Sequence, residues 1–510
     1  MRIHRQYRGV SGSANLAEVL ATAAAVEGAT GRAAYLVGDR VFTHGDVHDG
    51  AARTATLLAR AGVGRGDRVL LVVPDGIEFV WAFLGGVRLG AIVVPVNPRL
   101  TLGDHRQMLE VAGAKVVVSG AELAARFEGR AGVVVAEDLE HAKAGAQPHP
   151  AVEVDGGDPA YAQFTSGTTG APKAAVHRHA DARVYFEAFA RPAAAIGSED
   201  TLLSVSKMFF AYGLGNSLFF PLFAGCRAVL HPGSPRPGDV AALVRCHGVT
   251  VLFSVPTFYA RLLGGDDGGE WGSLRAAVSA GETLAVALAE RIRQTLGCPV
   301  LDGLGSTEVG QTFVSNTLEH QRDGTVGRPL PPYSVAVRDA DEGELPPGAP
   351  GTLWVRGPTV LVEYLGRPDA TAAVKRGEWL CTGDRAAVEP DGFVRHHGRM
   401  DDMEIVGGIN VGPLEIEAVL SRHPAVMEVA VVAVRDELGA SRLEAFVVPT
   451  AGAAPHADIG EELVSLARAE LAPYKVPRLV RFVDALPRTP TGKLRRFVLR
   501  SGTWPPTAAG

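Results

Sequence analysis

The chain has 510 residues, of which 46% are hydrophobic and 21% charged, and its formal net charge is −6. This length exceeds one ordinary core, so we expect two or more domains, and the composition is typical of a soluble globular protein. The lack of a basic excess argues against a nucleic-acid-binding protein.

Two further features narrow the class of protein. The four cysteines lie far apart without a CxxC pair, which argues against a metal cluster or a disulfide framework and favours reduced thiols. The most apolar stretch, residues 79–96, is interrupted by Arg88, by glycines and by Pro95, and no signal-peptide core precedes it. We therefore expect a cytoplasmic protein without a membrane span.

The first part of the chain alternates between helical and strand-like patterns. Residues 44–63 have helical spacing, with Asp46 placed to cap the helix, and residues 67–74 follow as a short apolar run. A second helical stretch, 76–90, leads to a second apolar run, 91–97. Both runs are continuously apolar rather than alternating, which is typical of parallel strands covered by helices. The pattern predicts an α/β fold with layered sheets.

The same alternation returns in residues 250–263 and 274–305, after which the chain becomes rich in strands and turns. The final part, from about residue 413, has the pattern of a small α+β unit. The charged, turn-rich segment 398–402 is the natural boundary before it.

Residues 164–177, FTSGTTGAPKAAVH, combine glycines with hydroxyls and a cation. Glycines let successive N–H groups converge on one concavity, and such a nest ahead of a helix N-terminus binds phosphate oxygens, to which Lys173 would add a positive charge. The chain has no Walker A motif, GxxxxGK[ST], so this is a different kind of loop. Taken alone, it fits an inert surface loop equally well.

Three other motifs carry side chains suited to nucleotide chemistry. In DGLGSTEVG, residues 302–310, Glu308 is an acceptor suited to Mg²⁺. Asp384 stands in a turn-rich segment and is suited to accept hydrogen bonds from ribose hydroxyls, and Lys493 stands on a Thr-Gly turn near the C-terminus. Each also has a purely structural explanation. Glu308 could be a helix-cap acid, Asp384 a turn former and Lys493 a solvated charge.

The order of the motifs YAQFTSGTTGAPKAAVH, SAGETL, DGLGSTE, TGD, GRMDD, GG and PTGK resembles the ANL superfamily of adenylate-forming enzymes. This superfamily includes acyl- and aryl-CoA synthetases, peptide-synthetase adenylation domains and luciferases. The resemblance runs from about residue 14 to 500. It implies a large N-terminal domain, 1–398, of layered α/β sheets with a distorted β-barrel, a hinge at 399–401, and a small, mobile α+β C-terminal lid, 402–510.

The segment FFAYGLGN, residues 209–216, with DGLGSTEVGQTFVSN and GTVGRPLPPY downstream, resembles the benzoate–CoA ligase branch. A flat slot for an aromatic ring would be lined by Phe210, Ala211, Tyr212, Gly213, Ser279 and Ala280, with room left by Gly303 and Gly305. The alternative is that the phenylalanines here, such as 209, 219 and 220, are core residues. A ring substituent needs one well-placed polar partner, and the candidates are Gln311, Ser279 and His177.

The resemblance implies a role for each remaining motif residue. The ATP phosphates would be held by Thr165, Ser166, Gly167, Thr168, Thr169, Gly170 and Lys173. Thr307 would contact the α-phosphate and Glu308 the Mg²⁺. The adenine would be framed by Gly281, Glu282, Thr283, Asp302, Gly303 and Leu304. Asp384 would bind the ribose hydroxyls with help from Arg399, and Lys493 would bridge the carboxylate and the α-phosphate.

These roles imply an ATP- and Mg²⁺-dependent ligase that converts an aromatic, benzoate-type acid to an aroyl-AMP and then to the CoA thioester. The lid would rotate about Asp401 after the first step, and Gly407 and Gly408 would then line a channel for the thiol. Ile405 is a departure, since many relatives carry a lysine near this place.

Four alternatives remain at this point. In the first, the acceptor is the phosphopantetheine thiol of a carrier protein, and in the second it is a nitrogen nucleophile. In the third, the chain is a nucleotide-binding regulator without catalysis. The presence of Lys173, Glu308, Asp384 and Lys493 argues against the regulator. A P-loop NTPase, the fourth, is disfavoured by the missing Walker motif. A homodimer is left open.

Overall fold

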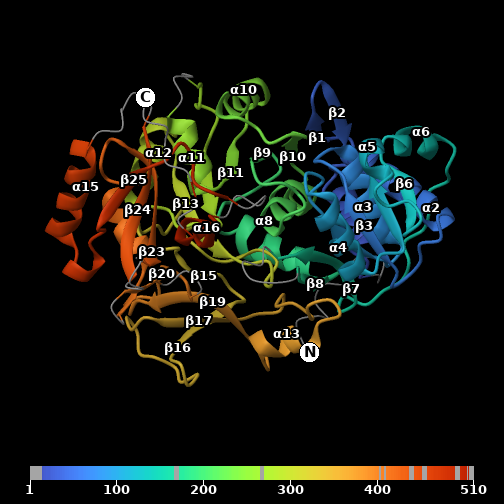
Figure 1. The fold of residues 1–510 in the computed structure, drawn as a ribbon. Coiled ribbons are helices and arrows are strands. Elements are labelled where there is room, and N and C mark those ends of the chain that lie inside the picture. Colours follow the sequence, from blue (N-terminus) through green and yellow to red (C-terminus); the bar gives the residue numbers. More distant parts are fainter. Residues whose placement is uncertain are drawn as a thin grey trace.

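The computed structural model describes residues 14–165, 172–264, 269–400, 404–406, 409–435, 441–450, 457–488, 494–501 and 504. The larger part is built on three sheets, and residues from 404 onward form a separate group of strands and helices beside them (Figure 1). The mixed α/β architecture expected from the sequence is confirmed.

A six-stranded sheet forms one side of the larger part, with neighbouring strands parallel except for the last pair. Its strands, in spatial order, are β6 (Gly132–Val135), β5 (Val116–Ser119), β3 (Arg68–Val72), β4 (Ile92–Pro95), β7 (Pro159–Phe164) and β8 (Ala174–Arg178). The apolar runs predicted at 67–74 and 91–97 are the adjacent parallel strands β3 and β4.

A nine-stranded sheet forms the centre, and it is parallel from β13 through to β1. Its strands, in spatial order, are β15 (Arg328–Pro329), β14 (Thr312–Ser315), β13 (Val300–Gly305), β12 (Ala276–Ala280), β11 (Val251–Ser254), β9 (Thr201–Ser204), β10 (Arg227–Leu230), β1 (Ala33–Val37) and β2 (Arg40–Thr43).

An antiparallel half-barrel completes the larger part, where the resemblance implied a distorted barrel. It consists of β16 (Ser334–Arg338), β17 (Gly351–Arg356), β18 (Lys375–Arg376), β19 (Trp379–Val388) and β20 (Val394–Arg399). The remaining strands belong to the C-terminal part: β21 (Glu404–Val406), β22 (Ile409–Val411), β23 (Val426–Arg435), β24 (Ser441–Pro449) and β25 (Leu479–Phe482).

The helices cover the sheets. In chain order they are α1 (Leu16–Val26), α2 (His44–Arg60), α3 (Ile77–Arg88), α4 (Leu102–Ala112), α5 (Ala121–Ala124), α6 (Asp138–Ala144), α7 (Asp181–Tyr185), η2 (Phe186–Ala190), α8 (Ala211–Leu214), η3 (Gly215–Phe219), α9 (Phe220–Ala224), α10 (Pro237–His247), α11 (Pro256–Leu263), α12 (Val286–Leu296), α13 (Pro368–Val374), α14 (Pro413–Leu420), α15 (Ala457–Glu470), η5 (Pro473–Lys475) and α16 (Arg496–Arg500). Helix α2 begins with a capping box in which Thr43 is the N-cap and Asp46 is its N3 partner.

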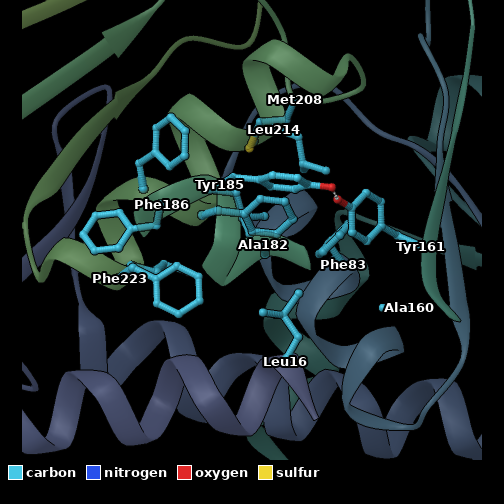
Figure 2. Close-up of a cluster of buried hydrophobic side chains, with 14 of the residues drawn as sticks. Leu16, Phe83, Ala160, Tyr161, Ala182, Tyr185, Phe186, Met208, Leu214 and Phe223 are labelled. Atoms are coloured by element: carbon cyan, nitrogen blue, oxygen red, sulfur yellow. Dashed lines mark hydrogen bonds between the residues drawn. The ribbon is translucent and has the colours of Figure 1, made fainter. Parts of the chain in front are cut away.

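The main hydrophobic core fills the space between the six- and nine-stranded sheets. Along β3, Val69 and Leu71 point into this core, whereas Leu70 and Val72 pack on the other face under α4 and α5. Burial on both faces explains why the strand is apolar throughout. Figure 2 shows a part of this core in which Phe83, Tyr161 and Tyr185 lie together and Phe186 packs against Phe223.

The C-terminal part has two small hydrophobic clusters of its own, on the two faces of the β23–β24–β25 sheet. Strand β20 ends at Arg399 and β21 begins at Glu404, so the predicted hinge falls between them. Asp401 lies outside the described residues. The division into domains at 399–401 stays a prediction.

Helix α8 packs directly on the backbone of the loop before it. A Cβ on Gly213 would lie 2.1 Å from the carbonyl oxygen of Lys207 and 2.5 Å from that of Ser206. Both neighbours are backbone atoms, so neither can move aside without shifting the chain. The absence of a side chain at Gly213 therefore fixes the position of the FFAYGLGN segment.

We expect Gly213→Ala to lower the free energy of unfolding by about 1–3 kcal/mol, the usual scale for overpacking a close contact. Urea denaturation followed by circular dichroism measures the change. Gly272→Ala is the matched control, because Gly272 is exposed and a Cβ there would meet nothing within 4 Å. Equal stability of the two variants would contradict this packing argument.

Candidate active site

The glycine-rich loop joins two antiparallel strands, β7 and β8, rather than a strand and a helix. This corrects the expectation of a nest ahead of a helix N-terminus. The Thr165 N–H donates to the Lys173 carbonyl oxygen at 2.8 Å and closes the loop. The predicted phosphate-binding residues between them, Ser166, Gly167, Thr168, Thr169 and Gly170, lie outside the described residues.

Lys173 and Glu308 both contact one tyrosine side chain, Tyr364. The Lys173 ammonium stands 5.0 Å from the centre of the Tyr364 ring, and the Tyr364 hydroxyl donates to Glu308 Oε1 at 2.8 Å. Burial and the charge of Glu308 raise the pKa of Tyr364, so it remains a donor. The predicted phosphate cation and the predicted Mg²⁺ ligand are thus brought together by Tyr364, which sequence reasoning missed because VEYLG carries no motif.

The turn between β13 and β14 carries Thr307 and Glu308, and a buried hydrogen-bond chain supports it. His177 Nε2 lies 2.8 Å from the Thr307 carbonyl oxygen, and the Tyr185 hydroxyl lies 3.2 Å from His177 Nδ1. Tyr161 donates to the Tyr185 hydroxyl at 3.0 Å (Figure 2). Because a carbonyl only accepts, His177 donates from Nε2 to Thr307.

His177 was a candidate partner for a ring substituent, and the structure places it elsewhere. Its side chain is fully buried beneath the turn, with Asp181 Oδ2 at 3.5 Å from Nδ1. Gly310 in the same turn has φ +87°, and a Cβ there would lie 1.9 Å from the Tyr185 hydroxyl oxygen. His177 and Tyr185 therefore fix the backbone from which Thr307 and Glu308 project.

Asp384 in β19 is buried at the edge of the half-barrel, with basic side chains next to it. His396 Nε2 lies 3.3 Å and Arg399 Nη1 3.5 Å from Asp384 Oδ1. Burial alone would raise the pKa of Asp384, but the hydrogen bond from His396 and the two positive charges hold it below its ordinary value. The carboxylate is thus kept ionised, as an acceptor of two ribose hydroxyls must be.

The predicted adenine segment lies against this acid. Thr283 Oγ1 is 3.3 Å from His396 Nδ1, which links the SAGETL segment to Asp384 through a histidine that sequence reasoning did not select. Gly281 has φ +88°, the left-handed conformation that glycine adopts without strain.

Both carboxylate oxygens of Glu282, a residue of the predicted adenine segment, accept hydrogen bonds from other residues of the chain. Oε2 accepts from the Thr257 N–H and hydroxyl at 3.0 and 2.6 Å, and Oε1 accepts from Arg488 Nη1 at 3.1 Å. Arg488 also donates to Glu428 at 2.8 Å. The C-terminal part is thus joined to the adenine segment.

Asp302, Gly303 and Leu304 lie on β13, next to β12. Ser279 is the register partner of Asp302, and Ala280 that of Gly303. Burial raises the pKa of the Asp302 carboxyl well above its ordinary value, and its Oδ1 has no hydrogen-bond partner among the described residues. Such a carboxyl is suited to accept a hydrogen bond from an amino group such as that of adenine.

The residues predicted to line the aromatic slot lie at the start of and within α8, on β12 and on β13. Ala211 and Tyr212 are half-buried, and Phe210 packs edge-on against Phe209 at 4.6 Å between ring centres. The Tyr212 hydroxyl donates to the Val278 carbonyl at 3.3 Å. Phe209, Phe219 and Phe220 are buried core residues, as the alternative explanation had it.

Gly303 and Gly305 permit β14 to fold closely on β13. A Cβ on Gly303 would lie 3.0 Å from Thr312 Cγ2, and one on Gly305 would lie 2.9 Å from the Gln311 carbonyl oxygen. They bring Gln311, whose Nε2 lies 3.5 and 3.4 Å from the Ala211 and Tyr212 carbonyls, onto α8.

The remaining predicted residues, Gly407, Gly408 and Lys493, lie outside the described residues. On either side of the Lys493 turn, Arg488 and Leu494 form an antiparallel bridge. Because Arg488 also contacts Glu282, this end of the C-terminal part lies at the adenine side of the site.

Among the described residues, no three histidine, cysteine, aspartate or glutamate side chains come together as a metal site. A single carboxylate such as Glu308 suits Mg²⁺ that is also held by substrate phosphates. No helix in this part of the chain is long and apolar enough to cross a membrane.

The predicted phosphate cation Lys173, the predicted Mg²⁺ ligand Glu308 and the residue Gln311 against α8 thus lie around one turn. The sequence matches the AMP-binding enzyme family over residues 22–365 and the AMP-binding enzyme C-terminal domain over residues 415–493. The chain therefore belongs to the AMP-binding enzyme family.

Relatives place it in the aryl-CoA ligase branch of the ANL superfamily, as the motifs predicted. It is 44% identical over 489 residues to the p-hydroxybenzoic acid–AMP ligase FadD22 of Mycobacterium tuberculosis (strain ATCC 25618 / H37Rv), covering 95% of this chain and 68% of that protein. It is 38% identical over 470 residues to the benzoate–CoA ligase of Thauera aromatica, covering 89% and 88%.

Solved structures agree with this placement. A benzoate CoA ligase from Burkholderia xenovorans LB400 is 36% identical with a TM-score of 0.89, covering 95% of this chain and 99% of that one. The anthranilate CoA ligase AuaEII in complex with anthranoyl-AMP is 31% identical with a TM-score of 0.92, covering 96% and 97%. The protein is an AMP-forming acid–thiol ligase that uses ATP, Mg²⁺ and CoA.

We expect His177→Leu to lower the rate of acid-dependent ATP–pyrophosphate exchange by roughly 10- to 100-fold, because the Thr307 carbonyl loses its donor and a small displacement of reacting groups is costly. His177→Gln, which keeps an N–H at the end of the side chain, is the matched variant and should recover most of the rate. Equal losses in the two variants, with wild-type stability, would contradict the positioning role.

Proposed function

We propose that the enzyme converts a benzoate-type acid and ATP to an aroyl-AMP and pyrophosphate at the Thr307–Glu308 turn, and then transfers the aroyl group to the thiol of CoA. The observation that supports this most is the meeting of three groups at one turn. Glu308 contacts the Tyr364 hydroxyl, Lys173 stands over the Tyr364 ring, and Gln311 of the same turn contacts α8 of the slot.

The chemistry follows from charge. A carboxylate must attack an α-phosphorus that is already surrounded by negative oxygens, so positioning and cations do most of the work. In this proposal Lys493 supplies positive charge where the new bond forms, and Lys173 neutralises the departing pyrophosphate. Glu308 would hold Mg²⁺, which supplies further charge neutralisation when bound. The aroyl-AMP then carries a good leaving group, and a thiol displaces AMP without a protein nucleophile.

The second step would use a rotation of the C-terminal lid, 402–510, about Asp401 against the adenylation domain, 1–398. The rotation removes Lys493 from the site and presents Gly407 and Gly408 to the pantetheine arm. A homodimer is a further proposal, tested by the mass in solution.

A carrier-protein phosphopantetheine thiol is the second candidate acceptor. It is favoured by the 44% identity to p-hydroxybenzoic acid–AMP ligases. These relatives are longer than this chain, and the match covers 68% of their length. A nitrogen nucleophile and a non-catalytic nucleotide-binding regulator remain the more distant alternatives.

The proposed reaction predicts its products. With ATP, Mg²⁺ and a panel of benzoic and fatty acids, we expect AMP and, when CoA is present, an aroyl-CoA identified by its mass. Aroyl-AMP that accumulates and ignores CoA would move the acceptor to a carrier protein or an amine. No AMP with any acid would overturn the proposal and favour the regulator.

Replacing Lys493 separates the two half-reactions. Lys493→Ala should slow aroyl-AMP formation by roughly 10²–10³-fold, the scale for losing one pre-placed charge, because its ammonium acts only in adenylation. Thioester formation from supplied aroyl-AMP should stay close to wild type. Lys475→Ala is the matched control, since this lysine pairs with Glu415 within the C-terminal part. Equal loss of both half-reactions would refute the assigned role.

A further inference from the structure

The turn between β13 and β14 has three consecutive carbonyls, those of residues 307–309, that each accept a hydrogen bond from another part of the chain. The first accepts from His177 Nε2 at 2.8 Å, and the second accepts from the Leu361 N–H at 2.7 Å. The third accepts from the Thr359 hydroxyl at 2.8 Å. All three donor residues are fully buried. The backbone around Glu308 is therefore held at three successive peptides.

The proton of the Thr359 hydroxyl can point in only one direction. A hydroxyl carries one proton and a carbonyl only accepts, so this proton points to the Val309 carbonyl. The Tyr333 hydroxyl lies 2.9 Å from Thr359 Oγ1 and must be the donor in that second hydrogen bond. Burial raises the pKa of Tyr333, so the phenol keeps its proton at neutral pH. The hydrogen bonds thus run from Tyr333 to Thr359 and from Thr359 to Val309.

The Tyr333 side chain is itself fixed by packing. It is buried, and its ring centre lies 6.3 Å from that of Phe313 on β14. A Cβ on Gly357 would lie 2.2 Å from Cδ1 of the Tyr333 ring, so the ring lies directly on the backbone two residues before Thr359. A ring packed in this way leaves its hydroxyl little freedom to move. Tyr333 therefore orients Thr359 from a fixed position.

The segment that carries Thr359 is anchored to β8, the strand that follows the glycine-rich loop. Arg178 Nη1 on β8 donates to the carbonyls on either side of Thr359, those of Pro358 at 3.3 Å and Val360 at 3.0 Å. Farther along the same segment, the Tyr364 hydroxyl donates to the acidic side chain of the turn. One segment thus supports both the backbone of the turn and its carboxylate.

We propose that Thr359 is a positioning residue for the ATP half-reaction, whose hydroxyl, oriented by Tyr333, fixes the end of the turn and so the direction in which Glu308 projects. The peptide that it holds joins Val309 to Gly310, and Gly310 has φ +87°, a conformation that glycine adopts readily. This end of the turn has the most freedom to shift, so loss of the hydroxyl re-aims the carboxylate expected to hold Mg²⁺. The inference rests on the proposed function, which places ATP at this turn.

The test compares Thr359→Val, which removes the hydroxyl and keeps the branched shape, with Thr359→Ser, which keeps the hydroxyl. At saturating ATP, and with the acid that the wild-type enzyme uses best, we expect Thr359→Val to lower kcat for ATP–pyrophosphate exchange by about 10- to 100-fold. Thr359→Ser should recover most of this rate. Tyr333→Phe should lower kcat by only about 2- to 10-fold, because Thr359 keeps its proton and loses only its orienting partner.

Binding of the nucleotide gives a readout that does not depend on turnover. Isothermal titration calorimetry measures Kd for ATP with and without Mg²⁺, and the ratio of the two is the gain in affinity that the metal brings. Thr359→Val should reduce this gain by roughly 10-fold, the lower end of the usual effect of losing a group that orients a metal ligand. A residue that only stabilised the fold would leave the ratio unchanged.

Thr250→Val is the matched control, because it is the same substitution at a hydroxyl remote from the turn. The Thr250 hydroxyl donates to Asp200 Oδ1 at 2.7 Å, directly before β11. Since β11, β12 and β13 are parallel, this is the opposite edge of the sheet from the one at which the turn follows β13. Thr250→Val should keep wild-type kcat and the wild-type gain from Mg²⁺.

The possible results distinguish this inference from the proposed function. A wild-type kcat and Mg²⁺ gain in Thr359→Val, equal losses in Thr359→Val and Thr359→Ser, or the same losses in Thr250→Val overturn the role of Thr359 and leave the proposed function intact. If Thr359→Val does not fold, Tyr333→Phe decides, and an unchanged enzyme overturns the inference. Wild-type ATP binding that Mg²⁺ does not improve contradicts the metal role of Glu308 in both proposals. No exchange with any benzoate overturns both.

Discussion

The hydrogen bond between His177 and the Thr307 carbonyl determines the geometry on which the rest of the site depends. The turn between β13 and β14 carries the side chains expected to contact the α-phosphate and the metal, and its backbone would otherwise be free to shift at a strand end. His177 supports it from below, and the Leu361 N–H holds it from the side by donating to the Glu308 carbonyl at 2.7 Å. Both donors are buried, so water does not compete with them.

This single turn also couples the nucleotide side to the acid side. Glu308 in this turn accepts a hydrogen bond from Tyr364, and Lys173 lies over the Tyr364 ring. Gln311, near the end of the turn, contacts the Tyr212 carbonyl of α8. A displacement of a few tenths of an ångström would move both substrates' contacts together. The close glycine contacts oppose such a displacement, because Gly213 and Gly305 leave no space between backbone segments and Gly215 leaves none beside the Gln311 side chain.

The parts predicted from sequence are those with a local or periodic signal. Strands β3 and β4 were recognised because burial on both faces makes them apolar throughout. Linear motifs located the residues that surround the site, although most of the glycine-rich loop and Lys493 lie outside the described residues. Tyr364 and His396 were missed because nothing in their neighbours' identity marks them. They acquire significance only when other strands bring Glu308 and Asp384 beside them.

The contact between the C-terminal part and the adenine segment is made by partly exposed ion pairs. Arg488 bridges Glu282 and Glu428, and all three side chains keep between 13% and 24% of their surface exposed. Such a partly solvated pair contributes on the order of 1 kcal/mol or less, which thermal motion can break. By contrast Arg496, with 7% exposure, pairs with Glu417 inside the C-terminal part at 2.6 Å. The more buried pair thus lies within the C-terminal part, and the more exposed one joins that part to the adenine segment, which is the arrangement that the proposed rotation of the lid requires.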